Sequence, residues 1–360
     1  SEQDGQLCYW DLVNGGYKPV DHDPRQIWIP DLKADGKVVD KNPSATTLDM
    51  GDGVLLVEFH TKMNAVDEGI IKALLGAVER AENEGWNGVV IGNHSDTFSA
   101  GANLMLVMML ANQQKWDDLA NMVDEFQQAN MQLKYSKVPV VAAVGGMALG
   151  GGCEIPMHCD RVVVAGEAYM GLVEVGVGLI PAAGGTKELV CKLQAGVPHG
   201  ITLPPLALAE KAFENIALAK VSTSGKEAIE NGHLSPWQAR VELNRDHIIH
   251  WAKQEVLGLS TAGYRPPQPK PVRLPGGGAY GALLVGLDGF LKSGMASEYD
   301  VEIGKRLAKV ITGGDVPENL EVDEQYILDL EREAFLSLCG EDKTKERIQH
   351  MLMKGKPLRN

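Results

Sequence analysis

The sequence contains few cysteines and no apolar run long enough to cross a membrane. Its five cysteines are odd in number and have no metal-site spacing, which favours reduced thiols over a disulfide framework or a zinc site. A signal-peptide pattern is also missing at the N-terminus. We therefore expect a cytoplasmic protein without a membrane span and without a metal.

Basic residues are fewer than acidic ones. The chain has 34 Lys and Arg and 48 Asp and Glu, which gives a net charge of −14. Such a chain would repel a phosphate backbone unless it carried a strong local basic patch, which argues against nucleic-acid binding. Binding of a small anionic ligand needs only a few local cations, so it is compatible with this net negative charge. The apolar content of 44% and charged content of 23% are typical of a soluble globular protein.

The pattern of apolar residues divides the chain into three parts. Residues 1–50 are polar and weakly periodic, which predicts a leader or linker without its own core. In residues 51–236, short β-branched runs alternate with helical periodicity, which predicts βαβ connections in a core. Strand patterns disappear from about Ala207, so we expect residues 237–360 to form a helical C-terminal region.

A run of three glycines at 150–152 is the most informative feature. The apolar run before it, 139–144, predicts a buried strand, and a short helix is predicted over 153–159. Glycines let backbone N–H groups approach a ligand, and the start of a helix adds free N–H groups and its positive dipole end. This combination suits an oxygen that becomes negative during a reaction. Two carboxylates, Glu154 and Glu174, complete a candidate catalytic centre.

Three motifs, in this order, resemble the enoyl-CoA hydratase/isomerase (crotonase) superfamily. They are Phe98-Ser99-Ala100-Gly101-Ala102-Asn103-Leu104, Gly150-Gly151-Gly152-Cys153-Glu154, and Glu174 with Gly178-Leu179-Ile180-Pro181-Ala182-Ala183-Gly184-Gly185-Thr186. The resemblance implies an α/β fold of the ClpP/crotonase type, a spiral of ββα turns with a helical C-terminal extension. It also implies enoyl-CoA hydratase activity, the reversible syn addition of water to trans-2-enoyl-CoA in fatty-acid β-oxidation. One departure is Asn103, where the family usually has Asp.

The same resemblance implies roles for individual residues. The backbone N–H groups of Ala102 and Gly151 would polarise the thioester carbonyl, Glu154 would activate water, and Glu174 would donate a proton to Cα. As a coupled pair, the two carboxylates could share these roles. The expected acyl- and CoA-binding residues are Met63, Ala65, Ala100, Gly101, Leu104, Gly150 and Pro181. Coenzyme A would enter as part of the substrate, and no prosthetic group is expected.

The C-terminal part is similar to the C-terminal half of bacterial fused 3-hydroxyacyl-CoA dehydrogenase/enoyl-CoA hydratases. The residues that carry this similarity lie at 172–178, 346–351 and 357–360. It implies that residues 1–50 are the remnant of a join to a dehydrogenase part. The expected partners are an acyl-CoA thioester and either further copies of the chain, as a trimer or a multiple of it, or a docked dehydrogenase domain.

Two alternatives to the hydratase stay open at this point. A Δ3-Δ2-enoyl-CoA isomerase would need only one carboxylate, and a catalytically quiet binding or assembly module would need neither. The presence of both glutamates and both glycine-containing loops favours the hydratase. Met105, Met108 and Met109 recur on one helical face, where core packing and contact with a flexible acyl chain are both open.

Overall fold

The computed structural model describes residues 2–3, 6–20, 23–198, 200–201 and 203–360. Within these residues the centre is an eight-stranded sheet in the order β11-β10-β9-β7-β6-β5-β4, with β8 paired to β9. Its strands are β4 (Val38–Lys41), β5 (Ala45–Asp49), β6 (Val54–Phe59), β7 (Gly88–Gly92), β8 (Thr97–Ser99), β9 (Val140–Leu149), β10 (Arg161–Gly171) and β11 (Ala239–Glu242). The strands from β6 to β11 run parallel, whereas β4 and β5 pair antiparallel.

Both faces of this sheet are covered. Along β6, Leu55 and Val57 belong to one buried cluster, whereas Val54 and Leu56 belong to another. Because successive side chains of a strand point to opposite faces, each cluster occupies one side of the sheet. Burial on both faces explains why this strand is a continuous apolar run in the sequence.

Helices supply the other half of each cluster. On the first face lie α2 (Glu68–Glu84) and α4 (Trp116–Lys134), and on the second lies α9 (Ile248–Thr261). The Asp67 side chain caps α2 by accepting the N–H of Ile70 at 2.9 Å. The helix is followed by Gly85 in the left-handed conformation, which glycine adopts without strain.

The sheet begins earlier and ends later than the expected core of residues 51–236. Two strands before that core, β4 and β5, belong to the sheet, and β5 is almost wholly buried. After residue 236, β11 adds an edge strand and α9 covers the second face. The C-terminal region is helical, as predicted, but strands do not disappear after Ala207, because β12 (Val272–Leu274) and β13 (Leu320–Val322) form a further antiparallel pair.

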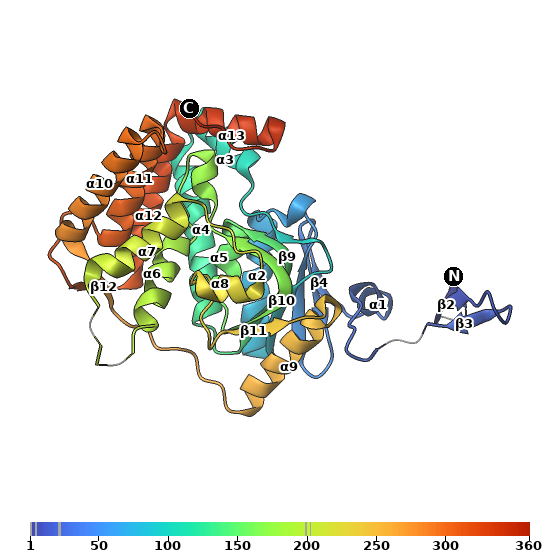
Figure 1. Ribbon diagram of the computed structural model, residues 1–360. Coiled ribbons are helices and arrows are strands. Elements are labelled where there is room, and N and C mark those ends of the chain that lie inside the picture. Colours follow the sequence, from blue (N-terminus) through green and yellow to red (C-terminus); the bar gives the residue numbers. More distant parts are fainter. Residues whose placement is uncertain (1, 4–5, 21–22, 199, 202) are drawn as a thin grey trace.

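The C-terminal helices pack beside the sheet, where they are coloured orange and red in Figure 1. They are α10 (Gly276–Lys292), α11 (Glu298–Thr312), α12 (Glu324–Cys339) and α13 (Asp342–Lys354). The helices before them are α1 (Ile29–Ala34), α3 (Leu104–Asn112), α5 (Gly151–Met157), α6 (Gly185–Ala195), α7 (Pro205–Ala217) and α8 (Gly225–Glu230), with short 3-10 helices η1 (Lys62–Asn64), η2 (Glu174–Val177) and η3 (Arg245–His247). Helix α12 packs against α4 and α6, so the C-terminal region reaches the start of α6.

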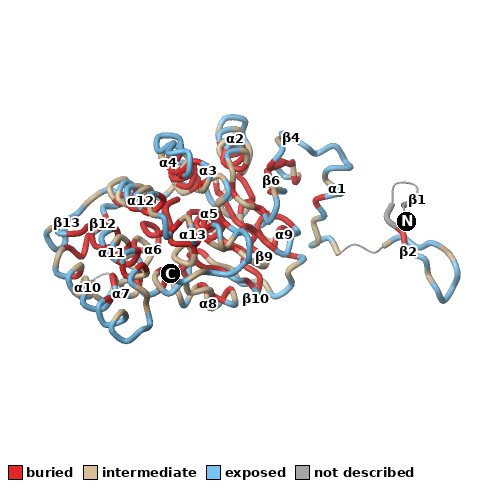
Figure 2. Tube along the Cα trace, turned by 90° about the horizontal axis from the view of Figure 1, so that it is seen from above, coloured by how far each residue is buried: buried red, intermediate tan, exposed pale blue. Residues whose placement is uncertain are grey.

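A small sheet of β1 (Glu2–Gln3), β2 (Gln6–Trp10) and β3 (Tyr17–Pro19) lies apart from the main body in both Figure 1 and Figure 2. The Trp10 and Tyr17 rings meet edge to face with centroids 5.0 Å apart, and both side chains are exposed. No described helix has the length and apolar character that a membrane span requires.

Candidate active site

Two turns meet at the ends of neighbouring strands. Strands β8 and β9 are paired in parallel, so the chain leaves both at the same edge of the sheet. A Cβ placed on Gly101 would lie 3.2 Å from the Gly151 nitrogen, and one placed on Gly151 would lie 3.4 Å from the Ala102 nitrogen. The two turns are therefore in contact, and they bring together the N–H groups expected to act as donors.

Both donors are free of protein acceptors. Helix α5 begins at Gly151, two residues before the expected start, so the Gly151 N–H lies in the first turn and has no intrahelical acceptor. Throughout the described chain, neither this N–H nor that of Ala102 donates a hydrogen bond. The backbone has φ +96° at Gly101 and φ +54° at Gly150, values that glycine adopts without the strain of a Cβ.

Glu154 points from the first turn of α5 toward the start of α6. Its side chain is 2% exposed, and its Oε1 accepts the N–H groups of Ala183 at 2.9 Å and Gly185 at 2.7 Å. Burial raises the pKa of Glu154 to about 7, although these two hydrogen bonds act to lower it. A carboxyl with such a pKa can take up and release a proton near neutral pH.

Glu174 approaches the same glycines from η2. A Cβ placed on Gly150 would lie 2.9 Å from Glu174 Oε1, while Glu174 Oε2 is buried without a partner among the described residues. Burial and repulsion by Glu154 raise the pKa of Glu174 well above its usual range. Both carboxyls therefore bind a proton more tightly than a free glutamate does, and as neighbours they titrate as a pair.

Several of the expected substrate-binding residues line the same turns. The Met63 carbonyl accepts the Ala100 N–H at 3.1 Å, which joins η1 to the loop after β8. Val66, the residue after Ala65, donates its N–H to the Gly101 carbonyl at 2.8 Å. Met63 is half-exposed beside this contact.

The remaining expected residues begin the adjoining segments. Leu104 is the first residue of α3, and the Asn103 side chain caps this helix by accepting the Leu106 N–H at 3.3 Å. Pro181 is buried two residues before the Ala183 N–H that binds Glu154. Asn in place of the family's usual Asp therefore still serves as a helix cap.

Of the three methionines on α3, two are too exposed to be core residues. Met105 is 56% exposed and Met109 is 44% exposed, whereas Met108 packs against the core. Flexible, polarizable side chains on this surface are compatible with contact to an acyl chain.

Glu331 of α12 was not identified from the sequence. It is fully buried, and it accepts the N–H groups of Gly184 at 2.9 Å and Lys187 at 2.6 Å. The sequence did contain an indication of its role. Glu331 lies on the buried side of α12 together with the apolar residues Ile327 and Leu338. A charged residue within an apolar helical stripe is unusual unless it has a specific partner.

Lysines neutralise an acidic group that otherwise resembles a metal site. Glu188, Cys191 and Glu324 place one ligand atom each within 4.8 Å of one another. Lys187 Nζ lies 2.8 Å from Glu188 and 2.7 Å from Glu324, and Lys134 Nζ lies within 3.0 Å of both carboxylates. The group is therefore satisfied as an ion-pair network.

This network extends behind Glu154. The His158 Nδ1 lies 2.7 Å from the Glu154 carbonyl oxygen, and its Nε2 lies 2.9 Å from Lys187 Nζ. Burial, aided by the positive charge of Lys187, lowers the pKa of His158 to about 3. The neutral ring can therefore donate to the carbonyl from Nδ1 and accept from the lysine at Nε2.

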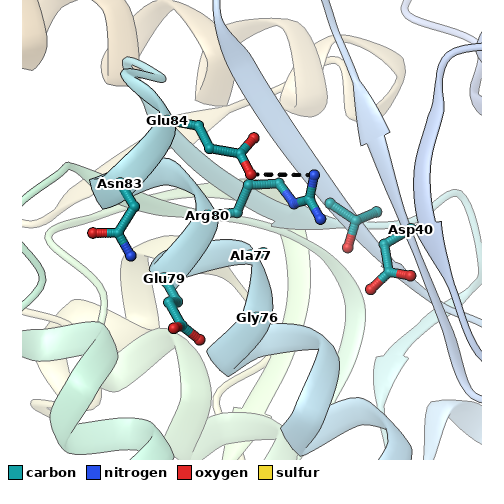
Figure 3. A pocket seen from close by; sticks show the side chains of 8 residues that line it. Asp40, Gly76, Ala77, Glu79, Arg80, Asn83 and Glu84 are labelled. Carbon is teal, nitrogen blue, oxygen red and sulfur yellow. Dashed lines mark ion pairs between the residues drawn. The ribbon is translucent and has the colours of Figure 1, made fainter.

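A cavity of about 270 Å³ lies between α2 and the strands β4 and β5 (Figure 3). Its wall includes Asp40 and the Arg80–Glu84 ion pair, whose nearest atoms are 3.5 Å apart. None of the expected site residues lines it. The cavity is therefore separate from the turns that hold Glu154.

Comparison with known proteins finds a matching family for part of the chain. Residues 49–205 match the model of the family described as enoyl-CoA hydratase/isomerase. The chain is 44% identical to a probable 3-hydroxyacyl-CoA dehydrogenase of Bacillus subtilis (strain 168), over all of this chain and 44% of that protein. It is 27% identical to a putative fatty acid oxidation complex trifunctional enzyme of Rickettsia felis, over 89% of this chain and 40% of that protein.

The chain thus spans less than half the length of either relative. Among solved structures, an enoyl-CoA hydratase from Bacillus halodurans superposes with a TM-score of 0.57 at 17% identity, over 85% of this chain and 99% of the other. This likeness confirms the predicted crotonase fold. Within this chain, residues 49–205 are thus similar to the enoyl-CoA hydratase/isomerase family.

Proposed function

We propose that this chain is an enoyl-CoA hydratase that adds water reversibly, in syn geometry, to the double bond of a trans-2-enoyl-CoA. The observation that carries the proposal is the pair formed by the buried Glu154 and by Glu174, whose Oε2 is buried. They lie beside two N–H groups that have no acceptor among the described residues. This pairing provides for both charge stabilisation and proton transfer.

The N–H groups of Ala102 and Gly151 bind the thioester oxygen. When water adds to Cβ, this oxygen gains negative charge as the thioester becomes enolate-like. Loss of a comparable donor in other enzymes costs about 3 kcal/mol of transition-state stabilisation. The N-terminal end of α5 adds a favourable dipole at the same place.

The two carboxyls handle the protons. Glu154 takes one proton from the water as its oxygen bonds to Cβ, and protonated Glu174 gives its proton to Cα. The causes of the pKa shift at Glu174 are compatible with this division, because burial and repulsion by Glu154 favour its protonated form. The proton gained by Glu154 then returns to Glu174, which completes the cycle.

The biological setting is part of the same proposal. The chain matches part of a relative described as a probable 3-hydroxyacyl-CoA dehydrogenase and part of another described as a putative fatty acid oxidation trifunctional enzyme. We infer that it makes 3-hydroxyacyl-CoA for a dehydrogenase part in fatty-acid β-oxidation. Coenzyme A belongs to the substrate, and the chain assembles with its own copies or with the dehydrogenase.

The direct test is to mix the protein with crotonyl-CoA and follow the ultraviolet absorbance of the enoyl thioester. Hydration removes the conjugated double bond, so the absorbance should fall, and a 3-hydroxyacyl-CoA should appear by mass spectrometry. Conversion of a 3-enoyl-CoA to a 2-enoyl-CoA without hydration would instead identify an isomerase. If enoyl-CoA substrates of every acyl-chain length tested gave no reaction, the remaining alternative would be a binding or assembly module.

A further inference from the structure

Two buried carboxylates from distant parts of the chain meet at the start of α6. Helix α6 has Gly184 at its N-cap position, and no side chain of its own first turn accepts a capping hydrogen bond. Its N–H groups are instead divided between Glu154 of α5 and Glu331 of α12. The C-terminal region thus reaches the amides that hold the proposed water-activating carboxyl.

The donors alternate along the turn. The N–H groups of Ala183 and Gly185 point to Glu154, whereas those of Gly184 and Lys187 point to Glu331. Adjacent peptide units therefore donate to different carboxylates. A change in the Gly184 peptide plane alters φ or ψ at the Cα atoms that join it to its neighbours, so it can shift the Ala183 and Gly185 N–H groups.

This arrangement is costly if it serves folding alone. Glu331 is fully buried, and burial together with the nearby Glu154 raises the pKa of Glu331 to about 8. Two buried carboxyls at one helix start repel each other when both are ionised, and an apolar side chain would avoid that cost. The N–H groups at the start of a helix nevertheless favour an acceptor with negative charge.

We propose that Glu331 is a positioning residue for the hydration reaction. By holding the Gly184 and Lys187 amides, it keeps the Ala183 and Gly185 amides aimed at Glu154 Oε1, and so fixes the carboxyl that activates water. The inference rests on the proposed function. It gives the C-terminal helical region a part in catalysis, through α12, beyond assembly or closure of the site.

The test compares Glu331→Ala and Glu331→Gln with Glu324→Gln. Glu324 lies about two turns earlier on α12, is also buried, and pairs with Lys134 and Lys187. Its replacement weakens the docking of α12 without removing an acceptor from the α6 amides. It is therefore a matched control for a purely structural role.

We expect both Glu331 variants to lower kcat for crotonyl-CoA by about tenfold or more, with KM changed less than about twofold, because misplacement of a reacting group acts mainly on the chemical step. Glu331→Gln should retain more activity than Glu331→Ala, since its carbonyl oxygen can accept one of the two N–H groups. Glu324→Gln should lower Tm while the kcat of the folded protein stays near that of the wild type. Equal kcat in all four proteins would overturn the proposal.

A crystal structure of a folded Glu331 variant gives a readout that does not depend on turnover. The proposal predicts that Glu154 Oε1 loses at least one of its contacts to Ala183 and Gly185, which are 2.9 and 2.7 Å in the native chain. Unchanged contacts would exclude a positioning role whether or not the wild type hydrates crotonyl-CoA. Lost contacts in a chain whose wild type is inactive would instead reject the proposed function and keep the positioning role.

Discussion

The Oε1 atom of Glu154 accepts the backbone N–H of Gly185 at 2.7 Å, across thirty-one positions of sequence. This contact joins the helix after the glycine turn to the helix after Glu174. It fixes one oxygen of a buried carboxylate. The predictions below follow from this fixed carboxyl and from the turns around it.

Glu154→Gln and Glu174→Gln should each reduce hydration of crotonyl-CoA by about 10²- to 10⁴-fold, because an amide keeps the shape but cannot exchange the proton. Binding of an acyl-CoA, measured by calorimetry, should change little. Glu167→Gln is a suitable control, because Glu167 is an exposed residue of β10 that bonds the Tyr169 hydroxyl. Near-normal turnover in either site variant would remove that residue from the mechanism.

The activity should fall as the pH drops through about 7, because Glu154 must be ionised to accept a proton from water. It should also fall at higher pH, where Glu174 loses the proton that it donates. A pH profile of kcat/KM, measured over a range in which the protein stays folded, checks both limbs. A flat profile through neutral pH would contradict the assigned roles.

Stability should respond to the same carboxyl. Folding raises the pKa of Glu154 from 4.5 to about 7, so the folded state binds the proton more tightly than the unfolded state does. The stability that this proton contributes is present below pH 4.5 and is lost as the pH rises to about 7. The Tm of Glu154→Gln relative to the wild type should therefore rise between about pH 5 and pH 8. A constant difference in Tm would contradict the raised pKa.

Gly151→Val should abolish turnover with both glutamates in place. Its Cβ would lie 2.9 Å from the Phe126 ring and 3.4 Å from the Ala102 nitrogen, so the new side chain displaces the donor turns. Gly258→Val is the control, since Gly258 is also a helical glycine and a Cβ there meets nothing within 4 Å.

Measuring Tm and turnover on the same samples separates the two effects. A Gly151 variant that melts near the wild-type temperature without turnover supports the donor role. Substantial turnover in the folded variant would mean that the thioester oxygen is bound elsewhere.

Removal of residues 276–360 should leave an aggregating or inactive protein. It deletes α10 to α13, uncovers the apolar surfaces of α4 and α6 against which α12 packs, and removes Glu331. Size-exclusion chromatography and the crotonyl-CoA assay check both outcomes. A soluble shortened chain with full activity would show that these helices serve neither the core nor the site.

The sequence predicted the strands and turns that consist of uniform local patterns. The β-branched run of 140–144 identified β9, and the glycines after it identified the turn that carries Glu154. Motif order was sufficient to select Glu174 and the Ala102 turn, and the fold brings these residues together. Their assigned roles remain predictions.

The missed elements depend on contacts distant in sequence. β5 contains Thr46 and Thr47, whose burial comes from pairing with β6. β11 is a short edge strand with Arg240 and Glu242, so no apolar run marks it. Glu331 meets its amides across a separation of 147 residues, and only its place on an apolar helix face indicates it.

The return of α9 to the second face of the sheet has a consequence for biosynthesis. Ile249 and Val256 of this helix share a buried cluster with Leu56 and Val163, residues that leave the ribosome much earlier. A nascent chain that ends before α9 therefore presents one side of a parallel sheet uncovered. Such a surface binds other chains readily, so chaperone capture should be strongest in the interval between completion of β10 and emergence of α9.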